Sequence, residues 1–163
     1  MRIRAMLLIL AALSLAACEQ PTSEQAATVF DGDWIAFSHP GDWTVTRQAQ
    51  GERQQIRLEG PAGAHLEIII LPADGTEDLE AFARGLPRDA TDASLLLADR
   101  PAHMGRLHGY RETLQLDGRQ VHREYHQVTR NEDTAYLVSE VAAARALQAQ
   151  PGFDLVFTTF RFK

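Results

Sequence analysis

The sequence predicts an α+β domain built on an antiparallel β-sheet. Two neighbouring segments, Gln55–Glu59 and His65–Leu71, carry the apolar alternation of paired strands. Asp117-Gly118 lies between two further extended segments and favours a two-residue hairpin turn. Between these two pairs, apolar residues spaced by three, four and seven predict one amphipathic helix over 79–86. A helix with one apolar stripe should lie across the sheet.

The N-terminal part of the domain is expected to begin near Val29. Phe30 and Trp34–Phe37 predict a first strand, because bulky apolar and aromatic residues are concentrated there. Ser38–Asp42 contains Pro and Gly and predicts a turn, and Trp43–Thr46 predicts a second strand.

The central pair of strands defines the expected core side. Gly60–Gly63 supplies the turn between them. The second strand becomes continuously apolar through Leu71, which indicates a central strand covered on both faces. Asp74–Glu77 supplies cap residues for the following helix, and Gly85 is the expected stop. Alternation places five apolar side chains on one face: Ile56, Leu58, Leu66, Ile68 and Ile70.

The Asp117-Gly118 turn fixes a register for the hairpin. A two-residue turn pairs Leu116 with Arg119 and thereby aligns every other position. Two opposite-charge pairs and one aromatic pair then follow from a single assumption, which supports the register. The pairs are Glu112 with Arg123, Arg111 with Glu124, Tyr110 with Tyr125, and Leu114 with Val121.

Two segments around this hairpin are less distinctive. Leu95–Leu97 fits either a buried turn of helix or a short strand. Asn131–Asp133 predicts a turn that leads into a strand over Thr134–Val141.

The C-terminal segment predicts mainly helix. Ala142–Ala149 is alanine-rich, and Pro151-Gly152 is expected to interrupt it. Apolar residues in Phe153–Phe160 follow helical spacing, although their β-branched and aromatic content alone favours a strand. We predict a short helix that ends in an extended Phe160–Phe162.

The first eighteen residues have the pattern of an export signal. Arg2 and Arg4 precede an apolar run, Met6–Leu15, which at roughly a dozen residues is shorter than the roughly 20 of a membrane-spanning helix. The run ends in Leu15-Ala16-Ala17 before Cys18, the only cysteine. This ending resembles the lipobox of bacterial lipoproteins, in which the cysteine is lipidated. The alternative is an ordinary signal peptide cut after Ala17.

The chain therefore divides into three expected parts. Residues 1–17 are the lipoprotein signal peptide, 18–28 the lipidated N-terminus and flexible tether, and 29–163 a single globular domain. Two or more acyl chains on Cys18 would anchor the protein stably. Glu19, which is not Asp, is associated in enteric-type sorting with the outer membrane, facing the periplasm.

Composition excludes several function classes. Removing residues 1–17 leaves 146 of 163 residues, and the net charge of −6 becomes −8 once Arg2 and Arg4 are lost. An acidic surface repels phosphate backbones, so no nucleic-acid partner is expected. Lys163 is the only lysine, which leaves little scope for Schiff-base chemistry. The sequence contains no phosphate-binding glycine loop, dinucleotide fingerprint or serine elbow.

Three short motifs occur in a recognisable order: Phe37–Trp43, Pro151-Gly152-Phe153 and the terminal Phe160–Phe162. Together with the predicted elements, they resemble the PsbP-like superfamily over residues 29–163; its bacterial members include DcrB-like envelope lipoproteins. The resemblance implies a twisted antiparallel sheet with helices on both sides, an α/β/α sandwich. It also implies a superfamily of mostly non-enzymatic accessory and binding proteins, and it transfers no catalytic residue. Trp43 and Phe160 are interpreted as core aromatics.

His122, Glu124 and His126 are weak candidates for a metal site. They alternate along one predicted strand and share a face, and ligands two residues apart can chelate zinc. The hairpin register, however, places Arg111 opposite Glu124, so a cation already neutralises the carboxylate. We predict no metal and no cofactor.

The first functional hypothesis is a non-catalytic, lipid-anchored envelope protein that binds a protein partner or assists envelope assembly. The alternative is a small-molecule or lipid-binding module with an apolar pocket between sheet and helix. An unrecognised hydrolase or metalloenzyme is the third. Four aromatic residues are candidates for a ligand or partner surface: Trp34, Trp43, Tyr110 and Tyr125.

Overall fold

The computed structural model describes residues 26–72, 75–86, 94–103, 105–131 and 133–163. The predicted signal peptide, Cys18 and most of the predicted tether lie outside these ranges, as does Asp74. Strand β1 begins at Ala27, two residues before the expected start of the domain.

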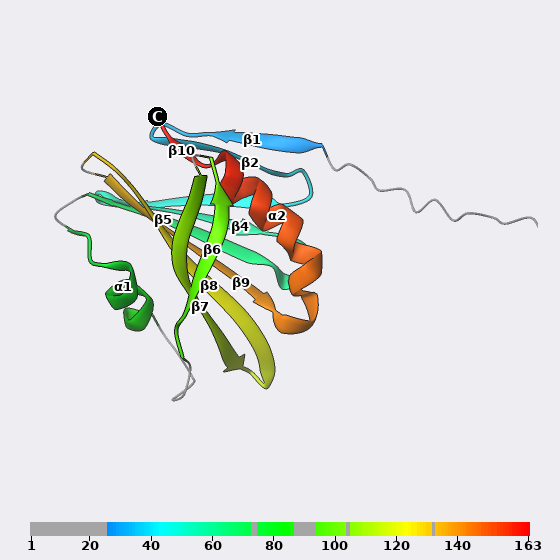
Figure 1. Ribbon diagram of the computed structural model, residues 1–163. Helices are drawn as coiled ribbons and strands as arrows, with labels where there is room; N and C mark the ends of the chain where they lie inside the picture. The colour runs from blue at the N-terminus through cyan, green and yellow to red at the C-terminus, as the bar shows by residue number, and fades with distance from the viewer. Residues whose placement is uncertain (1–25, 73–74, 87–93, 104, 132) are drawn as a thin grey trace, which may run out of the picture.

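A seven-stranded antiparallel sheet forms the centre of the molecule (Figure 1). Every neighbouring pair in it is antiparallel. Its strands, in spatial order, are β3 (Thr44–Gln50), β4 (Arg53–Glu59), β5 (His65–Pro72), β9 (Asp133–Ala142), β8 (Arg119–Arg130), β7 (Gly105–Leu116) and β6 (Leu96–Ala102).

A second, three-stranded sheet joins the two ends of the described chain. Its order is β1 (Ala27–Asp31), β2 (Ile35–Pro40) and β10 (Arg161–Phe162). The single first strand expected from Phe30 to Phe37 is therefore wrong. The chain reverses between β1 and β2, where the Gly32 N–H donates to the carbonyl of Ile35 at 3.0 Å. The two aromatic residues end up stacked across the strands, with ring centroids 4.8 Å apart.

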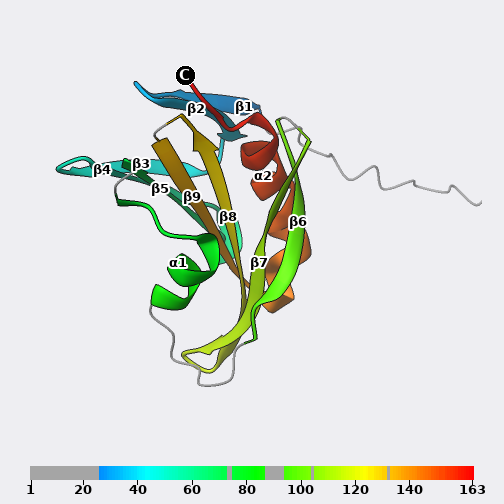
Figure 2. The same cartoon turned by 60° about the vertical axis from the view of Figure 1, so that its left-hand side comes forward.

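One helix covers each face of the large sheet, as Figure 2 shows. Helix α1 (Leu79–Gly85) packs on one face, and helix α2 (Ala146–Thr159) lies on the other, after a short 3-10 turn, η3 (Ala143–Arg145). A second 3-10 turn, η1 (Pro61–Gly63), connects β4 and β5. The predicted α+β class, with an antiparallel sheet between helices, is confirmed.

Central strand β5 has apolar contacts on both of its faces, as predicted. The five apolar residues expected on one face all belong to the core under α2, together with Phe153, Val156 and Phe157. On the other face, Ile69 joins a smaller core in which Phe82 of α1 stacks on Tyr136 at 3.9 Å. Helix α1 is capped by Asp78, whose Oδ1 accepts from the Ala81 N–H at 2.9 Å, one residue beyond the predicted cap segment.

The predicted β7–β8 register is confirmed at each position. Leu116 pairs with Arg119, Glu112 with Arg123, Arg111 with Glu124 and Tyr110 with Tyr125. Asp117 and Gly118 both have positive φ, as the tight turn requires. The segment after Leu95, which fitted helix or strand, forms edge strand β6 and pairs with β7.

The predicted break of the C-terminal helix at Pro151-Gly152 is wrong. Helix α2 continues through both residues, and β9 extends to Ala142, where helix was expected. Gly152 lies against the Trp43 ring, since a Cβ there would be 2.4 Å from Cζ2. It permits close packing instead of ending the helix. Burial of the apolar face of α2 outweighs the hydrogen bond that Pro151 removes.

Candidate functional site

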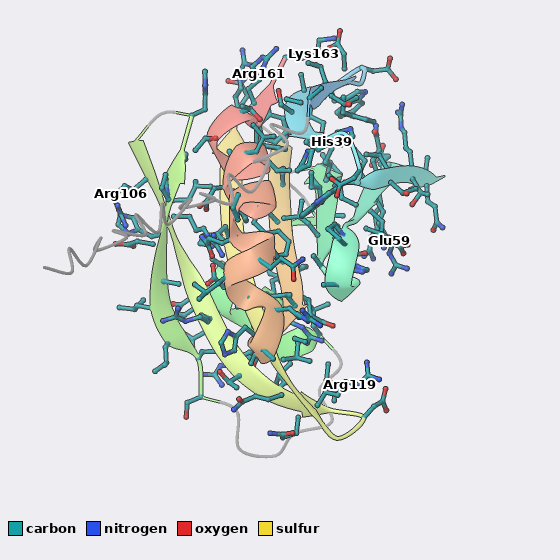
Figure 3. The ribbon with its side chains drawn as sticks, turned by 90° about the vertical axis from the view of Figure 1, so that its right-hand side faces the viewer. His39, Glu59, Arg106, Arg119, Arg161 and Lys163 are labelled. Atoms are coloured by element: carbon teal, nitrogen blue, oxygen red, sulfur yellow. The ribbon has the colours of Figure 1, made fainter. Side chains whose placement is uncertain are left out.

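A group of charged side chains lines a pocket between α2 and the sheet, which we name the α2 groove. The groove has a volume of about 200 Å³ and receives residues from β6, β7, β8, β9 and α2. Figure 3 views the molecule with α2 in front of the sheet and Arg106 on the β6–β7 side of the helix. The lining residues are Arg100, Arg111, His122, Glu124, Ser139, Val141, Ala146, Leu147, Gln150 and Phe153.

Arg100 ties three elements together beside this groove. Its Nε donates to Oε2 of Glu124 on β8 at 2.6 Å, and a terminal guanidinium nitrogen donates to Oδ1 of Asp154 on α2 at 2.8 Å. The guanidinium carbon lies 5.4 Å from the centre of the Phe157 ring. The side chains of Arg100 and Glu124 are only 7% and 14% exposed, so this ion pair is formed away from bulk water, whereas Asp154 is 37% exposed. This arrangement fixes α2 against the edge of the sheet.

Glu124 is ionised throughout the physiological pH range. Burial alone would raise the pKa of its carboxyl, but adjacent His126 and Arg100 together lower the pKa to about 2. Nε2 of His126 lies 3.5 Å from Oε2 of Glu124, and a terminal nitrogen of Arg111 lies 3.9 Å from Oε1. Arg100 is therefore the cation closest to the Glu124 carboxylate. Arg111, the predicted cross-strand partner, lies farther away and contributes less.

The lowered pKa of Glu124 makes the stability of the fold pH-dependent. Its carboxylate stabilises the folded state above the ordinary pKa of 4.5, and this contribution is lost as pH falls towards about 2. We expect wild type to lose more free energy of unfolding between pH 6 and pH 3 than Glu124→Gln, by on the order of 2 kcal/mol. Urea denaturation at both pH values measures the difference. Equal losses would mean that Glu124 is not responsible.

The residues considered for metal binding lie beside the groove. His122 is half-buried in the groove wall, while His126 is fully buried and packs edge-on against Phe157 at 5.0 Å. Glu124 lies between them in sequence, and its carboxylate forms an ion pair with Arg100. Within the ranges that the structure describes, no cluster of three or more His, Cys, Asp or Glu side chains could hold a metal ion.

A second polar cluster lies on the opposite face of β8, towards α1. The Tyr125 hydroxyl donates to Glu112, and Arg123 donates through Nε to Glu140 at 2.8 Å. Burial and the adjacent Glu112 carboxylate raise the pKa of Tyr125 to about 12. At neutral pH the phenol is therefore a hydrogen-bond donor that supports the fold.

The four aromatic candidates do not share one surface. Tyr110 and Tyr125 are cross-strand partners in the smaller core, whereas Trp43 packs edge-on against Phe153 at 5.4 Å beneath α2. Trp34 is 45% exposed in the β1–β2 turn and lines a separate hollow of about 310 Å³. The interpretation of Trp43 as a core residue is confirmed. A role of any of the four in ligand binding stays a prediction.

Solved structures show which fold this arrangement belongs to. No protein-family model matches the sequence, and no curated protein matches it. The solution structure of cyanobacterial PsbP from Synechocystis is similar at 12% identity, with 91% of this chain and 99% of that chain covered and a TM-score of 0.54. The chain has the PsbP-like fold. The resemblance inferred from the sequence is thus confirmed for the fold.

Two further solved structures are similar to this chain. LpqN of Mycobacterium tuberculosis, described as involved in cell envelope biogenesis, is 10% identical over 85% of this chain and 91% of its own, with a TM-score of 0.50. A Bacteroides thetaiotaomicron protein is 13% identical over 84% of this chain, with a TM-score of 0.55. This chain spans 48% of the Bacteroides protein.

The PsbP-like domain exposes three leucines at the start of edge strand β6 and in the first turn of α2. Leu96 and Leu97 at the start of edge strand β6 are 58% and 82% exposed, and Leu147 in the first turn of α2 is 92% exposed. Leu96 is the cross-strand partner of Arg111, and Leu147 lines the groove, so both lie at its mouth. We name these three residues the leucine rim. The sequence offered no sign of them beyond the apolar run of Leu95–Leu97.

Proposed function

We propose that the protein is a lipid-anchored accessory module of the bacterial cell envelope that binds another protein and has no catalytic role. The leucine rim carries this proposal. Leu96 and Leu147 are exposed on the α2 side of the sheet and Leu97 on the other side of edge strand β6; contact of these side chains with water is unfavourable, and a partner would remove it. Leu96 and Leu97 point to opposite faces of β6, so a partner that covers both must wrap the edge of the sheet.

The charged residues of the groove support binding over catalysis. Arg100, Glu124 and Asp154 are held by one another, and burial keeps Arg100 from reaching a substrate. Glu124 stays ionised and is therefore poorly suited to accept a proton near neutral pH. Tyr125 is locked in its protonated form on the other face. Arg100, Glu124 and Asp154 therefore have the geometry of structural ion pairs.

Two observations support a location in the cell envelope: the N-terminal sequence and the similarity of the fold to that of an envelope protein. LpqN, which has a similar fold, is described as involved in cell envelope biogenesis. Leu15–Cys18 has the lipobox pattern that would tether the domain through Cys18. In the part of the chain that the structure describes, no helix is long and apolar enough to cross a membrane. With Glu19 after the cysteine, we propose the outer membrane, facing the periplasm.

Replacing the lipidation site tests the anchor. In fractionated cells, wild type is expected in the membrane, whereas Cys18→Ala is released or remains as the unprocessed precursor, because the variant has no thiol to acylate. Treatment of intact cells with a crosslinker, followed by purification, should recover a specific partner with wild type. The tether variant Ser23→Ala is the matched control and should behave as wild type. Equal solubility of wild type and Cys18→Ala would refute the anchor.

A further inference from the structure

The α2 groove contains hydrogen-bond donors that the fold does not use. The Arg111 side chain is 50% exposed, and its nearest carboxylate oxygen, on Glu124, is 3.9 Å away, beyond hydrogen-bond distance. Among the described residues, neither ring nitrogen of half-buried His122 has a hydrogen-bond partner. Both side chains line the groove, which therefore has spare donors on its sheet side.

Two acceptor atoms in and beside the groove, in contrast, are occupied. Oε2 of Glu124 and Oδ1 of Asp154 accept from Arg100, and Asp154 also accepts from the Gln150 amide at 2.9 Å. Arg100 thus offsets part of the charge of both Glu124 and Asp154, and Arg111 is the second arginine near Glu124. A ligand for the remaining space should supply acceptors, and a carboxylate is the group that a guanidinium binds best. The first turn of α2, which forms part of the wall, contains no acidic residue that would oppose an anion.

The rest of the groove is apolar and small. Val141, Ala146 and Phe153 line it, and its volume of about 200 Å³ suits one residue-sized group and its carboxylate. Leu147 is 92% exposed at the mouth, and Leu96 lies next to Arg111 on the edge strand. A ligand that fills the groove and also covers these two leucines must continue outwards as a chain. A free small acid would leave both leucines in water.

We infer that the α2 groove binds the C-terminal residue of an extended segment of a partner protein. The terminal carboxylate lies between Arg111 and His122, and an apolar last side chain packs against Val141 and Phe153. The preceding residues of the partner cover the leucine rim. This inference rests on the proposed partner binding and names the part of the partner that is recognised.

Peptides with defined ends test the inference on the full-length lipidated protein in detergent. The probes are hexapeptide pools that end in Leu, Val or Phe, each made with a free carboxylate and with a C-terminal amide, and binding is followed by fluorescence polarisation. Acids should bind, and amidation should weaken binding about ten- to hundredfold, the factor for one charge-assisted hydrogen bond. Arg111→Gln should cause a similar loss. Arg106→Gln, on the same strand but the other face, should bind as wild type does.

Four outcomes would overturn this site. They are no binding of the acid pools at millimolar concentration, equal binding of acids and amides, unchanged binding by Arg111→Gln, and equally tight binding of N-acetyl-leucine alone. The last would assign the groove to a free small acid. A partner that still crosslinks at the leucine rim while the peptides fail would leave the proposed function standing and remove only the C-terminal contact.

Discussion

Arg100→Met is expected to lower the free energy of unfolding by about 3–5 kcal/mol, because it leaves a buried carboxylate without its closest cation. Arg100 is 6% exposed and pairs with Glu124 and Asp154 at 2.6 and 2.8 Å. Methionine fills a similar volume, so the loss arises mainly from the charge of Glu124, which keeps only the more distant Arg111 at 3.9 Å. Urea denaturation at pH 7 measures the change from the shift in midpoint at constant slope.

Two further variants distinguish the effect of the lost charge on stability from a general disturbance of strands β6 and β7. Arg106→Met changes an arginine that is 59% exposed and 3.7 Å from Asp99, and we expect a change within about 0.5 kcal/mol. Adding Glu124→Gln to Arg100→Met removes the orphaned charge and should recover part of the loss. If Arg100→Met is as stable as Arg106→Met, the network does not hold α2 on the sheet.

Phe157→Ala is expected to cost about 3–5 kcal/mol, the range for deleting a large core aromatic residue. The Phe157 ring is 1% exposed and packs between the His126 ring at 5.0 Å and the Arg100 guanidinium at 5.4 Å. Its removal opens a cavity beneath α2 and admits water to the ion pairs. The same urea measurement applies.

Leu147→Ala on the same helix is the matched control. Leu147 is 92% exposed, and Leu and Ala have similar helix propensities, so we expect a change within about 0.5 kcal/mol. The packing account is contradicted if Phe157→Ala costs less than about 1 kcal/mol, or if the two variants lose equal stability.

Local sequence information was sufficient for the central strands β4 and β5 and for the long hairpin. The Asp117-Gly118 turn sets its own register, because a two-residue turn with positive φ at both positions aligns every later pair. Alternation in β4 and β5 likewise identified the core face, since side chains in a strand alternate between faces.

Tertiary contacts decided the features that were missed. Pro151 and Gly152 are strong local breakers, but α2 continues through them because its apolar face is buried on the sheet and Trp43 occupies the space beside Gly152. Arg100 lies 24 residues from Glu124 and 54 from Asp154, and no periodicity encodes such a pair. The groove could therefore be found only once β6 was placed beside α2.

Site-specific photo-crosslinking in intact cells tests the central claim most directly. In the full-length protein, a photoreactive amino acid replaces either Leu97 or Leu147 of the leucine rim. The control carries it at Ala49 on edge strand β3, at the far side of the sheet. The account predicts one crosslinked product of the same mass from both rim positions and none from Ala49. It also predicts that Leu96→Arg weakens the Leu97 product severalfold. No product from either rim position, or the same product from Ala49, would contradict partner binding at the rim.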